Sequence, residues 1–446
     1  MRQERILQAS IFDVFAEHEI GRELKAMSRL LDDHCVPLLG LAIGDLRQCG
    51  LSETGRHGLS AEAVLRCALL KQYRQLSYEE LAFHLEDSAS FRAFARLPVG
   101  WSPKKSVLHN TISAISAQTW EGINQSLMGA ARRSKLDDGR MARIDSTVTE
   151  ALMHAPTDSA LLWDGVRVMV RLLKNASALP GAEPGVWRNH RRLAKKRAFA
   201  IQHARGAEKK AKLYRDLISA TRATMTALER AGEHLIACAV IDAEVLRGQI
   251  KHYLPLVARI IDQTERRVFA GESVPAGEKL VSLFETHADI IVKGGRDVQY
   301  GHKLNLITGR SGMILDVVVE AGNPADAERF VPMLERHIAQ HGAPPRQMAS
   351  DGGYASLDNL KRAKTLGVHD VAFHKKRGLK IEEMVKSRWV YRKLRNFRAG
   401  IEGNISCLKR AFGLDRCTWR GLAHFNAYVW SSVVAYNLAL FARHAT

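Results

Sequence analysis

The feature of this sequence that most constrains its fold is a β-branched run at residues 141–149, which lies between two long stretches of helical pattern. In an extended strand, side chains alternate between two faces. Ile144 and Val148 would therefore lie on one face, and Asp145 and Thr147 on the other. The run predicts the first strand of a new domain.

The segment before this strand has a helical pattern from about residue 6 to residue 124. Ser60 precedes an apolar stretch as a helix-capping serine does, and Ser77 and Glu80 have the spacing of a capping box. These signals predict an all-helical amino-terminal domain over residues 1–135, which would serve in DNA binding or oligomerisation. A helix-turn-helix and an ordinary helical core give the same pattern, so both interpretations stay open.

After a second helical stretch, the rest of the chain alternates between strand and helix signals. Strands are predicted at 289–292, 303–308, 313–320, 347–350 and 370–373, and helices at 323–340, 355–366 and 398–446. The loop 309–312 would join two of these strands as a hairpin. The order predicts an α/β fold, with a mixed-sheet domain formed by 136–158 and 280–446 and a helical, basic insertion at 159–279.

Positive charge is the compositional feature that bears most on function. Lys and Arg total 66 against 47 Asp and Glu, which gives a formal net charge of +19. Such an excess favours a polyanionic partner, because binding releases the counterions that nucleic-acid phosphates condense. Basic residues are densest at 188–215, where DNA contact or a solvated helical face would explain them. The predicted DNA contacts in this segment are Arg191, Arg192, Lys195, Lys196 and Arg197.

The sequence disfavours membrane-spanning and secreted proteins, and also small domains held by zinc or by disulfides. No stretch approaches the roughly 20 apolar residues that a membrane span needs, and the first residues lack a secretory hydrophobic core, so we expect a cytoplasmic protein. The 6 cysteines include no C-x-x-C pair, which argues against a zinc module and against a disulfide framework.

Three acidic residues stand out by their context. Asp145 lies in the predicted first strand, Asp351 ends a short strand before a pair of glycines, and Glu402 lies near an apolar helical stripe. Sites in α/β sheets form at the carboxyl ends of strands. Taken singly, each acid could equally be a turn or ion-pair residue. Together, three carboxylates without a cysteine suit two Mg²⁺ or Mn²⁺ ions, which can activate a nucleophile and stabilise a leaving 3′ oxygen.

Basic residues accompany the third acid. If the last predicted helix extends back past residue 400, then Arg395, Arg398 and Lys409 fall on one polar line with Glu402. Acid and bases would then face the same cleft, where the bases would hold a phosphodiester. Further candidates for phosphate contact, with an ordinary strand position as the alternative, are Lys293 and Lys303.

At these residues the sequence resembles the DDE transposases of bacterial insertion sequences, which have an RNase H-like catalytic fold. The similar blocks are Ile144-Asp-Ser-Thr-Val148, Ser350-Asp-Gly-Gly-Tyr354 and Arg398-x3-Glu402-x6-Lys409, the last resembling the family's Tyr-Arg-Glu-Lys signature. The helical segments 76–81 and 91–94 also look like the leader that precedes such domains. Where the signature has its tyrosine, this sequence has Arg395, with Tyr391 one turn earlier.

The resemblance implies that Asp145, Asp351 and Glu402 are the catalytic residues and the ligands of two Mg²⁺ or Mn²⁺ ions. It implies a transposase that binds the terminal inverted repeats of its element, hydrolyses phosphodiester bonds there and joins the freed 3′-OH to target DNA. Double-stranded DNA would be its partner, and a homodimer on DNA in the bacterial nucleoid would handle two element ends. The alternatives are a catalytically inactive DNA-binding regulator derived from a transposase and a stand-alone metal-dependent nuclease.

Overall fold

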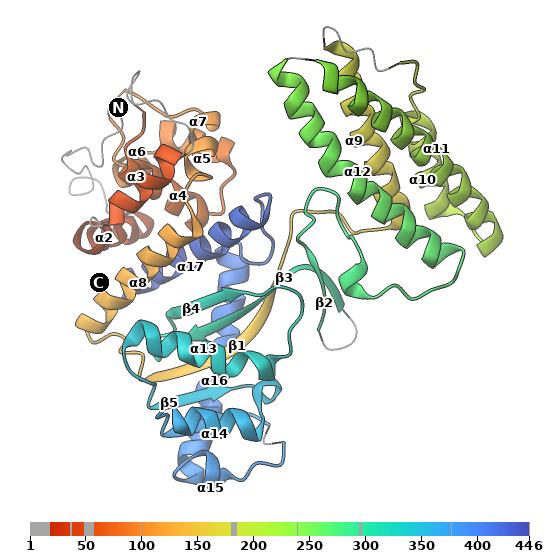
Figure 1. Cartoon of the computed structure of the whole chain (residues 1–446). Helices are drawn as coiled ribbons and strands as arrows, with labels where there is room; N and C mark the ends of the chain where they lie inside the picture. Colours follow the sequence, from red (N-terminus) through yellow and green to blue (C-terminus); the bar gives the residue numbers. More distant parts are fainter. Residues whose placement is uncertain are drawn as a thin grey trace. The chain divides into compact units, whose positions relative to one another are not determined.

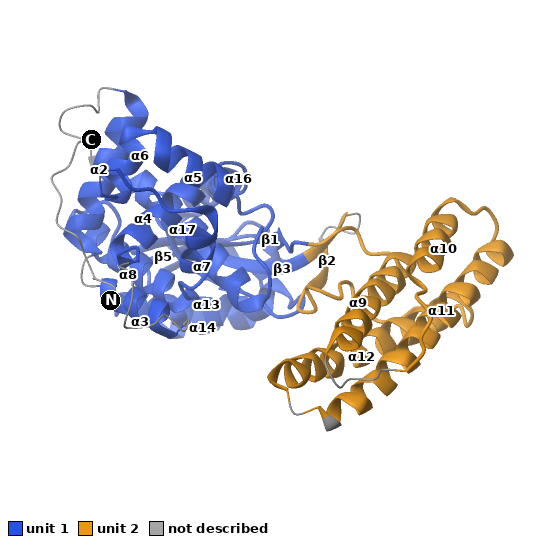
Figure 2. Ribbon diagram, turned by 90° about the horizontal axis from the view of Figure 1, so that it is seen from above, with its two compact units in different colours: residues 1–152, 301–446 blue, residues 153–300 orange. Residues whose placement is uncertain are grey.

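The computed structural model describes residues 18–35, 38–48, 58–98, 100–179, 185–238, 240–293, 297–375 and 377–445. These residues form two compact units (Figure 2). Unit 1 combines Met1–Leu152 with Gly301–Thr446, and unit 2 is Met153–Tyr300. Unit 2 is therefore inserted into the sequence of unit 1.

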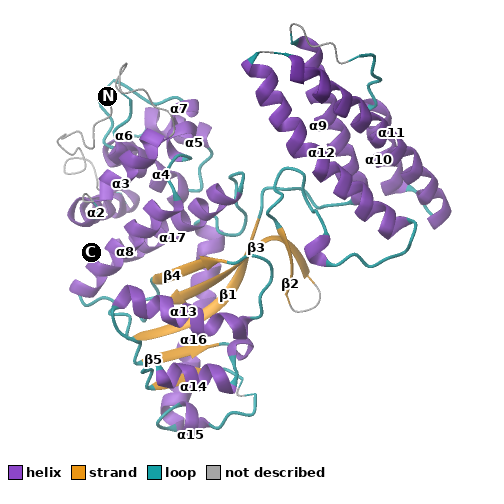
Figure 3. Cartoon of the chain, in the orientation of Figure 1, coloured by secondary structure: helices purple, strands orange, loops and turns teal. Residues whose placement is uncertain are grey.

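The described strands form one mixed sheet of order β2-β3-β1-β5-β6, in which β4 pairs with β3 (Figure 3). The strands are β1 (Met141–Glu150), β2 (Asp289–Lys293), β3 (Asp297–Thr308), β4 (Ile314–Val319), β5 (Gln347–Ser350) and β6 (Asp370–Phe373). β1 is antiparallel to β3 and parallel to β5, and β5 is parallel to β6. Because β1 has a neighbour on each side, it is buried along nearly its whole length.

Most of unit 1 is helical (Figure 1). Its helices are α2 (Glu19–His34), α3 (Leu39–Gln48), α4 (Ala61–Tyr73), α5 (Tyr78–Asp87), α6 (Ala89–Ala95), α7 (Lys105–Ile112), α8 (Ala117–Arg133), α13 (Asp326–His341), α14 (Leu357–Thr365), α15 (Ile381–Met384), α16 (Arg388–Ala411) and α17 (Leu422–Ala445), with a 3₁₀ turn η4 (Gly352–Tyr354). The last helix is the most apolar, and its central residues are buried on all sides. It packs against α2, α4, α8 and β4.

The amino-terminal helices and the sheet share one hydrophobic core. A buried polar cluster illustrates the connection. Asn437 on α17 donates from Nδ2 to Oδ1 of Asn124 on α8 at 2.7 Å, and its own Oδ1 accepts from the backbone N–H of Ile314 on β4 at 2.8 Å. The segment predicted as a separate helical domain over 1–135 therefore belongs to the same compact unit as the sheet.

Several local predictions are confirmed because they rest on short-range chemistry. Ser77 and Glu80 form both hydrogen bonds of a capping box, and the strands at 347–350 and 370–373 occur at the predicted residues. Two predictions are wrong. The helix predicted from residue 323 begins at Asp326, with Ala325 at its N-cap, and the helix predicted from residue 398 begins ten residues earlier, at Arg388.

Unit 2 contains a helical bundle with its own hydrophobic core, and it also includes β2 and the first four residues of β3. Its helices are α9 (Asp158–Ala178), α10 (Arg191–His203), α11 (Ala207–His234) and α12 (Ile241–Val268), with short 3₁₀ turns at η2 (Leu235–Ala237) and η3 (Ala276–Glu278). α9 contacts each of the other three helices. Among the described residues of the whole chain, no helix combines the length and the apolar character needed to cross a membrane.

Candidate active site

Asp145 occupies a mid-strand position on β1, and its side chain is only 12 % exposed. The backbone N–H of Ser146 donates to its Oδ1 at 2.8 Å. Its other oxygen, Oδ2, accepts from Nη2 of Arg398 on α16 at 2.9 Å. A buried carboxylate of this kind is tolerated because both oxygens have donors, one of them a cation.

Asp351 follows the last residue of β5 directly. The register pairs Ile144 on β1 with Ser350 on β5, so Asp145 and Asp351 take the next position on two adjacent parallel strands. This is the geometric reason that two acids 206 positions apart in sequence come together. The Asp351 side chain is 42 % exposed, so one of the two acids is enclosed and the other is open to solvent.

The two glycines after Asp351 allow the chain to pass close to its neighbours. A Cβ on Gly352 would lie 2.6 Å from Cβ of Lys375, and one on Gly353 would lie 2.7 Å from Oδ2 of Asp326. Any side chain at either position would push this turn away from its neighbours. The glycine pair thus holds Asp351 near β1.

Glu402 lies on α16, one turn after Arg398. Nη1 of Arg398 donates to its Oε1 at 2.9 Å. The Glu402 side chain is 66 % exposed and is the most solvent-accessible of the three acids.

Arg398 is the residue on which the three carboxylates converge. Its Nη2 lies 2.9 Å from Asp145 Oδ2 and 3.9 Å from Asp351 Oδ1, while its Nη1 binds Glu402. Burial acts to lower the pKa of Arg398, but attraction to Asp145, Asp351 and Glu402 outweighs it, so the pKa is raised. Its Nε is buried and has no hydrogen-bond partner among the described residues. The guanidinium is thus held by the charges of the acids rather than by a complete set of hydrogen bonds.

Arg143 places α16 across β1. It precedes Asp145 by two residues, so both side chains lie on the same face of the strand. Its guanidinium donates to Thr308 Oγ1 at 2.7 Å, to Asn404 Oδ1 at 2.6 Å and to the carbonyl oxygen of Phe397. A Cβ on Gly400 would collide with Nη1 of Arg143, so α16 comes this close only with glycine there.

The chemistry of these donors fits a divalent metal ion, because carboxylate oxygens are the ligands that Mg²⁺ and Mn²⁺ prefer. The distances between the three carboxylates, however, do not suit a single shared ion. Within the described residues, no three His, Cys, Asp or Glu side chains are close enough to hold one ion together. Since the guanidinium lies between the acids, ligation by all three would require Arg398 to turn away and the carboxylates to approach one another.

Residues 257–438 match the family model described as a transposase DDE domain. This part of the chain is similar to a transposase DDE domain. This match confirms the resemblance to the DDE transposases of insertion sequences. It includes Asp351 and Glu402 but begins after β1, so Asp145 lies outside it. Searches of curated proteins and of solved structures gave no match.

Two of the basic residues predicted beside Glu402 have partners other than Asp145, Asp351 and Glu402. Arg395 is exposed and lies over the ring of Tyr391, with 5.9 Å from Cζ to the ring centroid. Tyr391 in turn donates from its hydroxyl to the carbonyl oxygen of Phe373 on β6 at 2.8 Å. Lys409 pairs with Asp415 at 3.2 Å. Among the described side chains of the predicted line, only Arg398 forms a hydrogen bond or ion pair with the three carboxylates.

The remaining predicted DNA contacts lie elsewhere in the chain. Lys303 on β3 is buried and pairs with Asp326 at 2.7 Å. Lys293 ends β2, and its side chain lies outside the described part of the chain. The basic residues of α10 belong to unit 2, where Arg197 pairs with Asp216 at 3.0 Å. Four of the α10 residues are exposed, namely Arg191, Arg192, Lys195 and Lys196.

Sequence reasoning missed the residues that position α16 over β1 in this candidate site, chiefly Arg143, Gly400 and Asn404. Arg143 carried one usable signal, because an arginine two residues before a buried strand aspartate must itself find buried partners. Gly400 carried another, since a glycine inside a helix lowers stability unless close packing requires it.

Proposed function

We propose that this chain is a transposase that binds the terminal inverted repeats of an insertion sequence, hydrolyses phosphodiester bonds there and joins the freed 3′-OH to target DNA. One observation carries the proposal. Asp145 lies on β1, Asp351 follows the parallel strand β5, and Glu402 lies on α16. All three carboxylates approach the guanidinium of Arg398. The family match supports this class of reaction.

In this proposal the three acids hold two Mg²⁺ or Mn²⁺ ions. When bound, the metals would activate the attacking oxygen and stabilise the leaving 3′ oxygen. Asp145, enclosed by the sheet, would give the fixed ligand, and the exposed Asp351 and Glu402 would close on the ions from the solvent side.

Arg398 would then bind the DNA. Once metal ions balance the charge of the three acids, its planar guanidinium is suited to bind two oxygens of a DNA phosphate at the same time. Arg395 lies one turn earlier on the exposed surface of α16 and would extend this contact along the strand. Lys409 would join them only by giving up its pairing with Asp415.

The rest of the DNA would be bound by charge. We propose that the exposed cations of α10 in unit 2 neutralise phosphates of the inverted repeats, in keeping with a net charge of +19. Two element ends must be processed together, so we propose a homodimer on DNA, acting on chromosomal DNA in the cytoplasm.

The experiment uses the purified full chain and a labelled duplex that carries the element end with its flanking DNA. The duplex is incubated with Mg²⁺, with Mn²⁺ and with EDTA, and the products are separated on a denaturing gel. We expect metal-dependent nicks at the repeat boundary together with joined products. Tight binding without cutting would point to a regulator, and indiscriminate cutting without joining would point to a nuclease. A complex with one protein copy per pair of ends in light scattering would contradict the homodimer.

A further inference from the structure

Unit 1 has a cluster of basic residues at the amino ends of its parallel strands, whereas Asp351 lies at their carboxyl ends. Three adjacent strands each begin directly after a basic residue: Arg140 precedes β1, Arg346 precedes β5 and His369 precedes β6. The backbone connects them in a row. Gln347 N–H donates to Arg140 O at 3.0 Å, and His369 N–H donates to Arg346 O at 3.1 Å.

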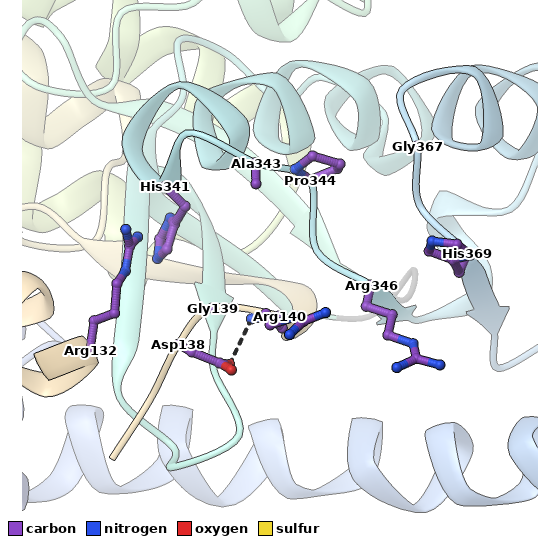
Figure 4. Close-up of a pocket in the computed structure, with 10 residues that line it drawn as sticks. All are labelled: Arg132, Asp138, Gly139, Arg140, His341, Ala343, Pro344, Arg346, Gly367 and His369. Carbon is purple, nitrogen blue, oxygen red and sulfur yellow. Dashed lines mark hydrogen bonds between the residues drawn. The ribbon is translucent and has the colours of Figure 1, made fainter. Parts of the chain in front are cut away.

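These residues line a pocket of about 630 Å³ (Figure 4). Arg132, near the end of α8, and His341, at the end of α13, form its other side. Adjacent strands are about 4.8 Å apart, so the row of side chains spans roughly 10 Å of the sheet edge. That length is comparable to one or two phosphate steps of a nucleic-acid strand.

The charge of this pocket is only partly balanced by protein acids. Arg132, Arg140 and Arg346 are exposed, and none of the three has a side-chain hydrogen bond or ion pair within the described part of the chain. One acid lines the pocket, Asp138, and its Oδ1 accepts the backbone N–H of Arg140 at 3.0 Å (Figure 4). Three arginines gathered around one acid repel one another unless an anion lies between them.

Helix dipoles explain only part of this arrangement. Arg132 and His341 lie at helix C-termini, where positive charge is favoured. Arg140 and Arg346 precede strands instead, and a strand start carries little dipole of its own. Their placement side by side therefore calls for an anionic ligand.

We infer that this pocket binds phosphate groups of a DNA strand away from the bond that is cut. Guanidinium groups match the geometry of phosphate oxygens, and a pocket open to solvent admits a continuous polymer. Asp351 lies five residues along the chain from Arg346, roughly 16 Å at the rise of a strand, so the pocket is too far away to hold the reacting phosphate. The inference rests on the proposed function in one respect: DNA is taken as the source of the phosphates.

The test compares the full chain with Arg140→Ala/Arg346→Ala. The control, Arg47→Ala/Arg133→Ala, removes the same charge from two exposed arginines outside the pocket. Binding of a labelled duplex is measured by fluorescence anisotropy across a range of salt concentrations. For the pocket variant we expect roughly tenfold weaker binding and a salt slope lower by about 0.9 for each lost phosphate contact. The control should keep the wild-type slope.

Equal slopes for the pocket variant and the control would overturn the inference. A second pair, Arg140→Gln/Arg346→Gln, keeps side-chain volume and guards against a folding defect. Inorganic phosphate is titrated as a competitor against chloride of the same ionic strength. Displacement of the duplex by phosphate, lost in the pocket variant, would support the inference, because phosphate can displace only DNA that occupies the pocket. Phosphate that binds the wild type but not the pocket variant, without displacing the duplex, would assign the pocket to a free phosphate ligand and overturn the DNA source. Failure of the proposed function would look different, since the wild type would bind duplex DNA without cutting it.

Discussion

At the scale of single residues, the proposed role of Arg398 depends on whether a divalent metal ion is bound. Its positive charge offsets the negative charges of Asp145 and Glu402, whose carboxylate oxygens each lie 2.9 Å from a guanidinium nitrogen. A divalent ion would offer the same acids a stronger and more compact positive charge. Arg398 and the metal therefore compete for the carboxylates, and this competition can be measured without any reaction.

Removing the guanidinium should destabilise the protein only when divalent metal is absent. In EDTA, Arg398→Gln should lose on the order of 1–3 kcal/mol of unfolding free energy, because Asp145 remains largely buried without its cation. Added Mg²⁺ should then stabilise the variant more than the wild type, since binding to the folded state raises stability. Urea unfolding with EDTA and with Mg²⁺ measures both effects. An equal response to Mg²⁺ in the two proteins would contradict the competition.

Asp351 is the acid best suited to a test of catalysis, because its partial exposure limits any effect on folding. Asp351→Asn should abolish metal-dependent cleavage and leave DNA affinity close to that of the wild type, since one ligand charge is lost and the shape is kept. The gel assay measures cleavage and anisotropy measures binding. The matched control is Asp358→Asn, an exposed aspartate in the first turn of α14, which should cut normally. Full activity of Asp351→Asn would remove Asp351 from the proposed site.

The lowered pKa of His337 makes the free energy of unfolding depend on pH. Burial, with a smaller contribution from His341, lowers its pKa to about 3 from an unfolded value near 6.5. The folded state keeps the ring neutral, so its contribution is complete above pH 6.5 and is lost as the pH falls toward 3. At about pH 5 the loss is about 2 kcal/mol. His337→Leu should therefore lie further below the wild type in urea unfolding at neutral pH than at about pH 5, and a constant gap would exclude this cause.

At the scale of elements, the position of α16 over β1 decides whether the three acids meet. Asp145 is fixed by the sheet and Glu402 by the helix, so a small shift of α16 would separate them. Arg143 ties the two elements together through Thr308, Phe397 and Asn404.

Two glycines of α16 give a direct test of this packing. Gly400→Ala should cost about 1–3 kcal/mol in spite of a helix-propensity gain of about 1 kcal/mol, because the new Cβ would collide with Arg143. Cleavage should fall with it. Gly403→Ala is the control, since nothing lies within 4 Å of a Cβ there. It should be neutral or stabilising by up to about 1 kcal/mol. Urea unfolding of both variants checks the difference, and equal costs would show that Arg143 yields without loss.

At the scale of the whole molecule, unit 2 enters and leaves the chain at two neighbouring points. Glu150 at the end of β1 pairs with Gly301 on β3, and the unit lies between them in sequence. Each unit has its own hydrophobic core. The sheet of unit 1 therefore does not depend on unit 2 for the pairing of β1 with β3.

Replacing residues 153–300 with a short Asn-Gly turn should leave unit 1 folded, because such a turn joins antiparallel neighbours. DNA affinity and its salt slope should both fall, since the exposed cations of α10 are removed. Near-UV circular dichroism and cooperative unfolding report on the fold, and anisotropy reports on binding. A shortened chain that fails to unfold cooperatively would show that unit 2 is needed for folding.

The sequence by itself determined what depends on short-range chemistry. The capping box at Ser77, the strands around Met348 and Val371, the mixed α/β class and the basic character all follow from local pattern and composition. Tertiary structure alone decided the rest. It placed Asp145 beside Asp351 through the pairing of β1 with β5, put Arg398 among the acids and merged the amino-terminal helices into the core of the sheet. These outcomes depend on strand register and on packing between distant segments, and a one-dimensional pattern does not encode which buried face meets which.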